Sequence, residues 1–297
     1  MLSILIPTYN YFIQELVTEL QRQALASGKP FEIIVSDDGS EDRYQSANRK
    51  VGDMDHVRYV QQEDSLRRSG NRNFLGKEAR YDYLLFIDCD ASVFSGDFIK
   101  NYLDCCRGKL AVCGGTAYTE TPPEDPRYFL RWFYGWKRET LSASTRNKDP
   151  GASFSAFNFL IERSVFLENP FPQDIREYGH EDTIFGLVLA GRGYEIRHID
   201  NQLVHSGLEP SKEFLAKSLK AVENLRALLS DDRYAGLIKG IRISRSYYRC
   251  RRCGLAIFLR WLFPAVRPAI ERNLTGKNPD LFYFDLYKLG YLLCLER

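Results

Sequence analysis

Short apolar runs alternate with longer polar segments from the first residue to about residue 206. The runs have the length of buried strands and lie at residues 2–6, 31–35, 57–60, 83–87, 110–113, 154–161 and 194–198. Helical patterns separate them, at residues 11–26, 41–51, 71–79, 96–106, 128–138 and 180–190. Strands that alternate with helices form parallel crossover units with helices on both faces of a sheet. The pattern therefore predicts an α/β fold with a mostly parallel, Rossmann-like sheet.

The pattern changes near residue 206. From Pro210 onward it is helical, and no further strand is predicted. We therefore expect two parts: an α/β domain at residues 1–206, followed by a helical C-terminal extension at residues 207–297.

Polar, turn-forming motifs follow three of the predicted strands. Parallel α/β sheets bind ligands at the carboxyl ends of their strands, so these motifs would face a single crevice. Each motif alone has an ordinary interpretation as a turn or a helix cap, because Asp, Asn, Gly and Ser favour both. The motifs are Pro7-Thr8-Tyr9-Asn10 after the first strand, Asp37-Asp38-Gly39-Ser40 after the second and Asp88-Cys89-Asp90 after the fourth.

The aspartates of the last motif are candidates for a metal site. Asp88 and Asp90 are two residues apart, so at the end of an extended strand their side chains would leave the same face. Two adjacent carboxylates repel each other unless a cation lies between them, and oxygen ligands favour Mg²⁺ or Mn²⁺. The alternative is a solvated pair that caps a helix beginning near Ser95.

Together with Asn71-Arg72-Asn73, these motifs occur in an order that resembles family 2 glycosyltransferases of the GT-A fold, the nucleotide-diphospho-sugar transferase fold. The resemblance covers about residues 1–206, which would be the catalytic domain. Its specificity lies in the ordered set, since no single motif is distinctive. One position departs from the family pattern: Asn71 stands where the family usually has alanine.

The resemblance implies a role for each motif in binding a nucleotide-sugar donor. Pro7 and Tyr9 would line the nucleoside pocket, and Thr8 and Asp38 belong to the same nucleotide-binding set. Asp37 would accept the imide proton of uracil, and Arg72 would reach the base or the phosphates. The aspartates of Asp88-Cys89-Asp90 would contact the metal and the ribose, with Asp90 as the firmer metal ligand.

Two further sites come from the same resemblance. Glu181-Asp182 stands at the start of a helical pattern, where carboxylates are ordinarily favoured by the helix dipole. In the family, such a pair supplies the general base that takes the acceptor's proton, and Asp182 is the candidate, with Glu181 orienting the base or the acceptor. His205 would complete the metal site, and its imidazole favours Mn²⁺ over Mg²⁺. A lone histidine at a strand end is otherwise a structural residue.

Composition and charge add the expected compartment. Of the 297 residues, 44% are hydrophobic and 27% charged, as in ordinary soluble proteins, and the seven cysteines are scattered without a disulfide framework. The N-terminus has no signal-peptide pattern, and no apolar run is long enough for a membrane-spanning helix. We expect a cytoplasmic protein.

Residues 239–272 form a basic segment with interleaved aromatic and aliphatic residues. This mixture suits a helix lying in the interface of an anionic membrane. The enzyme would then be peripheral on the inner face of that membrane. The alternatives are packing on the catalytic domain or on a second subunit of a homo-oligomer. Nucleic-acid binding has no other support in the chain.

The resemblance thus implies an inverting transferase that moves a sugar from a nucleotide-diphosphate donor, expected to be a UDP-sugar, with Mn²⁺ or Mg²⁺ as cofactor. The acceptor would be a hydroxyl of a saccharide or a lipid-linked saccharide, in the synthesis of a surface polysaccharide or glycoconjugate. Two alternatives stay open. One is a degenerate homologue that binds nucleotide or a partner without turnover. The other is a nucleotidyltransferase, which would ordinarily carry a Gly-rich phosphate loop after its first strand.

Overall fold

A computed structural model describes residues 1–175 and 177–296; the last residue of the predicted extension, 297, lies outside this part of the chain. The chain divides into two compact units. Unit 1 contains Met1–Tyr118, Glu139–Arg176 and Glu181–Gly207, and unit 2 contains Thr119–Arg138, Glu177–His180 and Leu208–Arg297. Residues 119–138 therefore group with the C-terminal helices, although they precede the expected boundary near residue 206.

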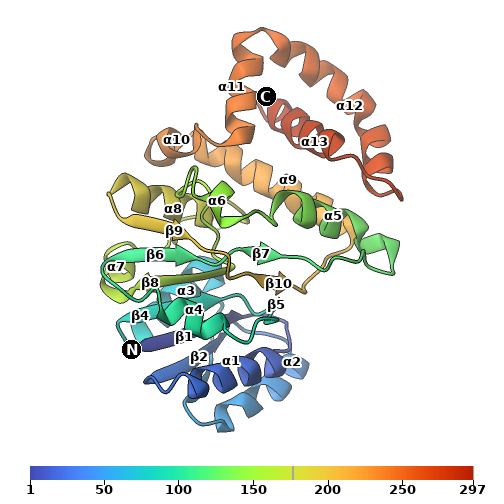
Figure 1. Ribbon diagram of the computed structural model, residues 1–297. Helices are drawn as coiled ribbons and strands as arrows, with labels where there is room; N and C mark the ends of the chain where they lie inside the picture. The colour runs from blue at the N-terminus through green and yellow to red at the C-terminus, as the bar shows by residue number, and fades with distance from the viewer. Residues whose placement is uncertain (176, 297) are drawn as a thin grey trace. The chain divides into compact units, whose positions relative to one another are not determined.

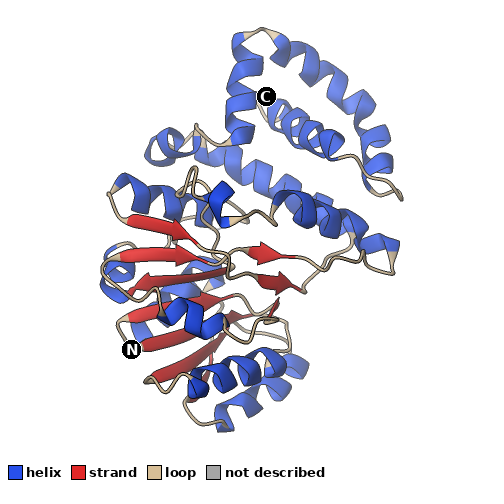
Figure 2. Cartoon of the chain, in the orientation of Figure 1, coloured by secondary structure: helices blue, strands red, loops and turns tan. Residues whose placement is uncertain are grey.

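Unit 1 is built on a seven-stranded sheet of order β3-β2-β1-β4-β8-β6-β9 (Figures 1 and 2). All neighbouring pairs are parallel except those that β8 makes with β4 and β6, which are antiparallel. The α/β fold class with a mostly parallel sheet is confirmed. The strands are β1 (Leu2–Thr8), β2 (Phe31–Asp37), β3 (Val57–Gln61), β4 (Tyr83–Ile87), β6 (Leu110–Cys113), β8 (Asn158–Glu162) and β9 (Glu195–His198).

The sequence pattern did not predict the second sheet, which has three short strands in the order β5-β10-β7. These strands are β5 (Ala91–Ser92), β7 (Thr116–Ala117) and β10 (Leu203–His205). They are too short to show a periodicity of their own, so only the pairing of distant segments reveals them. β10 runs antiparallel to β5, and this register sets His205 opposite Ala91.

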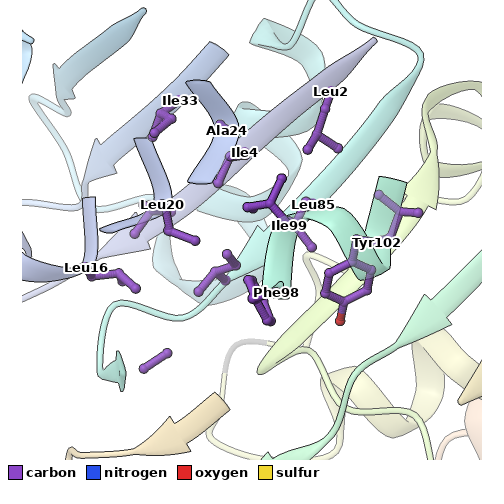
Figure 3. Close-up of a cluster of buried hydrophobic side chains, with 14 of the residues drawn as sticks. Leu2, Ile4, Leu16, Leu20, Ala24, Ile33, Leu85, Phe98, Ile99 and Tyr102 are labelled. Carbon is purple, nitrogen blue, oxygen red and sulfur yellow. The ribbon is translucent and has the colours of Figure 1, made fainter. Parts of the chain in front are cut away.

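Successive side chains of the central strands point to opposite faces of the large sheet, and both faces are apolar. Helices therefore cover both faces. Leu2, Ile4 and Ile33 point into one core, where they meet α1 and α4 (Figure 3). Leu5 and Phe86 point into the other, against α3, α7 and α8. The helical elements of unit 1 are α1 (Gln14–Ala26), α2 (Asp42–Asn48), η1 (Arg49–Asp53), α3 (Arg67–Glu78), α4 (Phe98–Leu103), α6 (Ala143–Arg146), α7 (Arg163–Glu168) and α8 (Glu181–Gly191).

The described part of unit 2 contains helices and loops and no strand, and its own hydrophobic core includes Leu130, Phe214, Phe284 and Tyr287. Its elements are η2 (Pro126–Tyr128), α5 (Phe129–Arg138), α9 (Ser211–Leu228), α10 (Asp232–Ile238), α11 (Arg242–Arg252), α12 (Leu255–Leu274) and α13 (Leu281–Cys294). None of the described helices is by itself long and apolar enough to cross a membrane. The pair α11 and α12, which meets at a bend of 113°, satisfies the length and composition criteria together.

Candidate active site

The loops after β1 and β2 lie side by side and are fastened to each other. Thr8 is in register with Asp37, at the carboxyl ends of their strands. The backbone N–H of Asn10 donates to Ser40 Oγ over 2.8 Å, and Asn10 Oδ1 accepts from the backbone N–H of Glu41 over 2.8 Å. Asn10 has a φ of +50°, a conformation that asparagine tolerates better than most residues. Two of the predicted motifs therefore lie side by side at the carboxyl ends of β1 and β2.

Asp37 is fully buried at the carboxyl end of β2, and it already accepts two hydrogen bonds. Its Oδ1 accepts from the backbone N–H of Ser40 over 2.8 Å, and its Oδ2 accepts from the Tyr59 hydroxyl over 2.7 Å. Burial and the Asp37 carboxylate both raise the pKa of Tyr59, so this phenol stays protonated and keeps donating. Asp37 therefore fixes the conformation of the loop after β2, and its contact with uracil stays a prediction.

Asp38 is occupied by the loop that leads into α3. Its two oxygens accept from the backbone N–H groups of Leu66 and Arg67 and from the Ser65 hydroxyl, over 2.6, 2.9 and 3.0 Å. The structure thus assigns its carboxylate to shaping that loop, and its role in nucleotide binding stays a prediction. Of the other nucleotide-binding candidates, Thr8 is buried, Pro7 is half-buried and Tyr9 is 60% exposed.

Arg72 comes from the first half of α3 and is almost completely buried. Its Nη2 donates to Asp88 Oδ1 over 2.6 Å. Burial lowers the pKa of Arg72, but the carboxylates of Asp88, Glu181 and Asp182 outweigh it, and the net shift is upward. Its Nε has no partner among the described residues. A permanently charged guanidinium with an unused donor suits an anionic ligand.

The two aspartates of the Asp88-Cys89-Asp90 motif do not share one extended face, so that expectation is wrong. β4 ends at Ile87, and the backbone N–H of Ala91 donates to the carbonyl oxygen of Asp88 over 3.1 Å, which closes a turn. Asp88 is paired with Arg72, whereas Asp90 faces His205. The structure therefore gives the two carboxylates different partners, and the higher rank of Asp90 as a metal ligand stays a prediction.

Asp90 and His205 form a close pair. His205 Nε2 lies 3.3 Å from Asp90 Oδ2. The imidazole ring stacks on Tyr118 and is tilted against Phe157, each with a centroid separation of 5.5 Å, and its buried Nδ1 has no partner among the described residues. Gly207 approaches so closely that a Cβ there would meet the Asp90 carboxylate. The pair is thus held by aromatic packing on one side and by bare backbone on the other.

This pair fits a divalent cation, but the predicted set of three ligands is not present. Within residues 1–175 and 177–296, no three His, Cys, Asp or Glu side chains gather as a metal-ligand group. Asp90 and His205 together offer an oxygen and an imidazole nitrogen, the donor types that Mn²⁺ accepts. Asp88 does not join them, because Arg72 holds it. Oxygen atoms of a diphosphate and water would have to complete the coordination.

The two candidate residues for proton transfer stand at the start of α8. Glu181 and Asp182 are its first two residues, where the helix dipole favours negative charge. Burial and the neighbouring Glu181 carboxylate raise the pKa of Asp182 to about 6. Glu181 is 8% exposed, and its Oε2 has no hydrogen-bond partner among the described residues. A carboxylate with a pKa near neutrality is suited to act as a general base.

Arg68 and Gly207 also lie beside the candidate residues, although neither was expected there from the sequence. Arg68 Nη1 lies 3.8 Å from Glu181 Oε1, so the first turn of α3 reaches the start of α8. Gly207 gives Asp90 its space. Adjacent arginines in a turn ordinarily indicate an exposed surface, and a single glycine ordinarily indicates a turn. In the sequence, Arg67 and Arg68 could have helped to neutralise a diphosphate, but an exposed basic turn was favoured at least equally, and Gly207 gave no signal of its own.

Comparisons with known proteins show the family and the fold of this chain. The model of the family described as glycosyl transferase family 2 matches residues 3–168. The chain is 24% identical to the hyaluronan synthase of Pasteurella multocida, over 71% of this chain and 25% of that protein. It is 27% identical to the GalNAc(5)-diNAcBac-PP-undecaprenol beta-1,3-glucosyltransferase of Campylobacter jejuni, over 99% of this chain and 98% of that enzyme. The chain therefore spans a quarter of the synthase but nearly all of the glucosyltransferase.

Among solved structures, the chain is similar to the mannosyltransferase PcManGT of Pyrobaculum calidifontis, determined in complex with GDP-Man and Mn²⁺. The TM-score is 0.56 at 16% identity, over 99% of this chain and 84% of that one. At this level of identity the similarity shows the fold, which is of the GT-A type.

Proposed function

The chain belongs to glycosyl transferase family 2, and on this premise we propose that it is an inverting transferase with Asp182 as its general base. The donor is a sugar linked to a nucleoside diphosphate, and the acceptor supplies a hydroxyl group. The observation that carries the proposal is the position of Asp182 at the start of α8, next to the buried Glu181, with its pKa raised to about 6.

The reaction is a direct displacement at the anomeric carbon. The acceptor oxygen attacks this carbon as the bond to the nucleoside diphosphate breaks, and Asp182 takes the proton from the attacking hydroxyl. A single displacement inverts the configuration. Glu181, with one unpaired buried oxygen, orients the acceptor by accepting a hydrogen bond.

The leaving diphosphate needs positive charge. Arg72 supplies a permanent charge from α3, with one donor still unused. Asp90 and His205 would hold a divalent cation, and such an ion, when bound, neutralises the charge that develops on the leaving group. Asp88 keeps Arg72 in place through their ion pair, and it is a candidate contact for the ribose.

The proposed donor is a UDP-sugar, because uracil offers an imide N–H to a carboxylate such as Asp37. The proposed acceptor is a lipid-linked saccharide in the synthesis of a surface polysaccharide or glycoconjugate. In support, the relative that spans nearly the whole chain is named for GalNAc(5)-diNAcBac-PP-undecaprenol. Such an acceptor would place the enzyme at the inner face of a membrane.

A donor screen tests the proposal. Purified protein is incubated with UDP-, GDP-, CMP- and dTDP-sugars, with and without Mn²⁺, and release of the nucleotide is measured. We expect release from a UDP-sugar that requires the metal. If the protein binds UDP but releases nucleotide from no donor, in the presence of lipid-linked and free saccharides, it is a binding homologue and the proposal fails.

The pH dependence of the rate is expected to report Asp182. Its carboxyl must be ionised to accept a proton, and its pKa is about 6. We therefore expect kcat/KM to fall about tenfold per pH unit below about pH 6 and to level off above it. The acidic limb should be absent from the residual activity of Asp182→Asn. If the acidic limb of the pH profile persists unchanged in this variant, the group that titrates is not Asp182.

A further inference from the structure

The outward face of α12 in unit 2 is apolar from Leu255 to Ala269. Ile257 and Trp261 are 77% and 79% exposed, and Leu255 and Phe258 are more than half exposed. Isolated exposed apolar side chains are ordinary, but four within seven residues form a patch. Pro264, Ala265, Pro268 and Ala269 are also exposed and continue it toward the end of the helix.

The opposite face of α12 is committed to unit 2. Ala256, Phe263, Ile270 and Leu274 are buried, and the helix packs against α13. Phe263 lies directly on Gly290 of α13, where any Cβ would overlap its ring. Because α12 already buries its opposite face within unit 2, the apolar patch is a second apolar face that the core of the unit does not cover.

The charged residues within the apolar part of α12 are turned away from this patch and are neutralised. Arg260 Nη2 donates to Glu296 Oε2 over 2.7 Å, and Arg267 Nε donates to Glu271 Oε1 over 2.8 Å. Between residues 254 and 271, the outward face thus carries no unpaired charge among the residues that the structure describes.

Unpaired arginines stand at both ends of the patch. Arg249 and Arg252 lie at the end of α11, just before the bend into α12, and Arg272 lies in the last turn of α12. All three are exposed, and none has a carboxylate partner in the described part of the chain. A helix of 20 residues is about 30 Å long, so the apolar stripe takes up most of this length and has free cations at each end.

We propose that this α11–α12 surface, formed by Ile257, Phe258, Trp261, Arg249, Arg252 and Arg272, lies in the interface of a membrane that contains anionic lipid. The apolar stripe enters the region between headgroups and acyl chains, and the arginines contact lipid phosphates at its ends. The inference goes beyond the proposed reaction and does not depend on it, because it rests on unit 2 alone.

The charge distribution favours this occupant over a second copy of the chain. A two-fold contact would bring the same surface onto itself, and the unpaired arginines of both copies would then meet. A nucleic acid would neutralise the arginines but would leave Ile257 and Trp261 without an apolar partner. A bilayer with anionic headgroups satisfies both parts of the surface.

Vesicle binding of the full chain, measured without donor or acceptor, tests the proposal. We expect sedimentation with phosphatidylglycerol-containing vesicles, little with pure phosphatidylcholine, and weaker binding as salt is raised. The triple variant Arg249→Glu, Arg252→Glu, Arg272→Glu should bind about a hundredfold more weakly, from about 1 kcal/mol per arginine. The matched control Lys212→Glu, Lys220→Glu, Lys277→Glu changes the net charge equally at exposed lysines elsewhere in unit 2, and it should bind much more tightly than the arginine variant.

Insertion of the apolar stripe is tested separately. Brominated lipid should quench the emission of Trp261, and Trp261→Phe provides the blank for Trp132 and Trp136. Ile257→Gln with Trp261→Gln should abolish vesicle binding, whereas Leu25→Gln with Leu167→Gln, at exposed leucines of unit 1, should not.

Several outcomes would overturn the proposal. One is binding without quenching of Trp261, and another is equal loss of binding in the lysine control. A third is a halved mass in solution for the Ile257 and Trp261 variant, which would assign the surface to contact between copies. Tighter binding to an oligonucleotide than to the vesicles would assign it to nucleic acid. Because no transfer is measured, failure of the proposed reaction would leave each of these results unchanged.

Discussion

Replacing Asp182 with asparagine is expected to lower kcat for sugar transfer by about 10²–10⁴-fold, the usual contribution of a positioned general base. Asparagine keeps the size of the side chain but cannot take a proton from the acceptor hydroxyl. Binding of UDP should change little, since the proton is moved only during the chemical step. Steady-state kinetics with a UDP-sugar and a separate titration with UDP distinguish these two effects.

The same variant should be at least as stable as the wild-type protein, so misfolding would not explain its loss of activity. Burial raises the pKa of Asp182 to about 6, so the folded state prefers the neutral carboxyl. Ionisation therefore lowers the free energy of unfolding as the pH rises from about 4 to about 6. The amide of Asp182→Asn cannot ionise, and the Tm of this variant at neutral pH should be higher by about 2–4 °C per kcal/mol gained. The gain should vanish near pH 4.

A matched control is available in the same unit. Glu195 is an exposed carboxylate at the start of β9, and Glu195→Gln removes one charge from a residue outside the candidate site. Its kcat should stay within about twofold of wild type. If Asp182→Asn retains wild-type kcat, or if Glu195→Gln loses as much, Asp182 is not the base.

Replacing Asp90 with alanine is expected to reduce the rate of transfer by about a hundredfold or more, because a cation contributes several kcal/mol to stabilising a leaving diphosphate. The pair of Asp90 Oδ2 and His205 Nε2, 3.3 Å apart, would lose its oxygen donor. The affinity for Mn²⁺, measured by titration in the presence of UDP, should fall together with the rate. Gly207→Ala should weaken the affinity for Mn²⁺ as well, because its Cβ would displace the Asp90 carboxylate.

Asp88→Ala separates the two aspartates. Asp88 is bound to Arg72 and does not face His205, so its loss should raise the KM for the donor more than it weakens Mn²⁺ binding. Asp97→Asn, at an exposed surface carboxylate, serves as the control without effect. Equal loss of Mn²⁺ affinity in Asp88→Ala and Asp90→Ala would contradict the division of roles that the structure indicates.

Several parts of the fold were predictable because they depend on local pattern. The strand predicted at residues 83–87 is β4, and the one predicted at 110–113 is β6. A run of apolar residues with this length and flanking turns identifies a buried strand wherever its partners lie. The start of α8 at Glu181 agreed within one residue, since acidic residues favour the first turn of a helix. The order of the motifs along the chain was also sufficient to indicate family 2.

The arrangement of Asp90 and His205 could not be predicted in this way. The sequence places Asp88 and Asp90 two residues apart, but whether they share a face depends on whether the chain continues extended or turns. The turn after β4 separates them. The pairing of β10 with β5 then brings His205 to Asp90 from a distant part of the chain, and β10 is too short for its sequence to predict that pairing.

The sequence by itself thus determined the α/β class, the motifs at the strand ends and the family, because these follow from residue type, period and order along the chain. Only the tertiary structure decided which carboxylate meets which partner: Asp88 with Arg72, Asp90 with His205, and Asp38 with the loop before α3. The physical reason is that a side chain's partners are set by the packing of segments that are remote in sequence, and a local pattern carries no record of that packing.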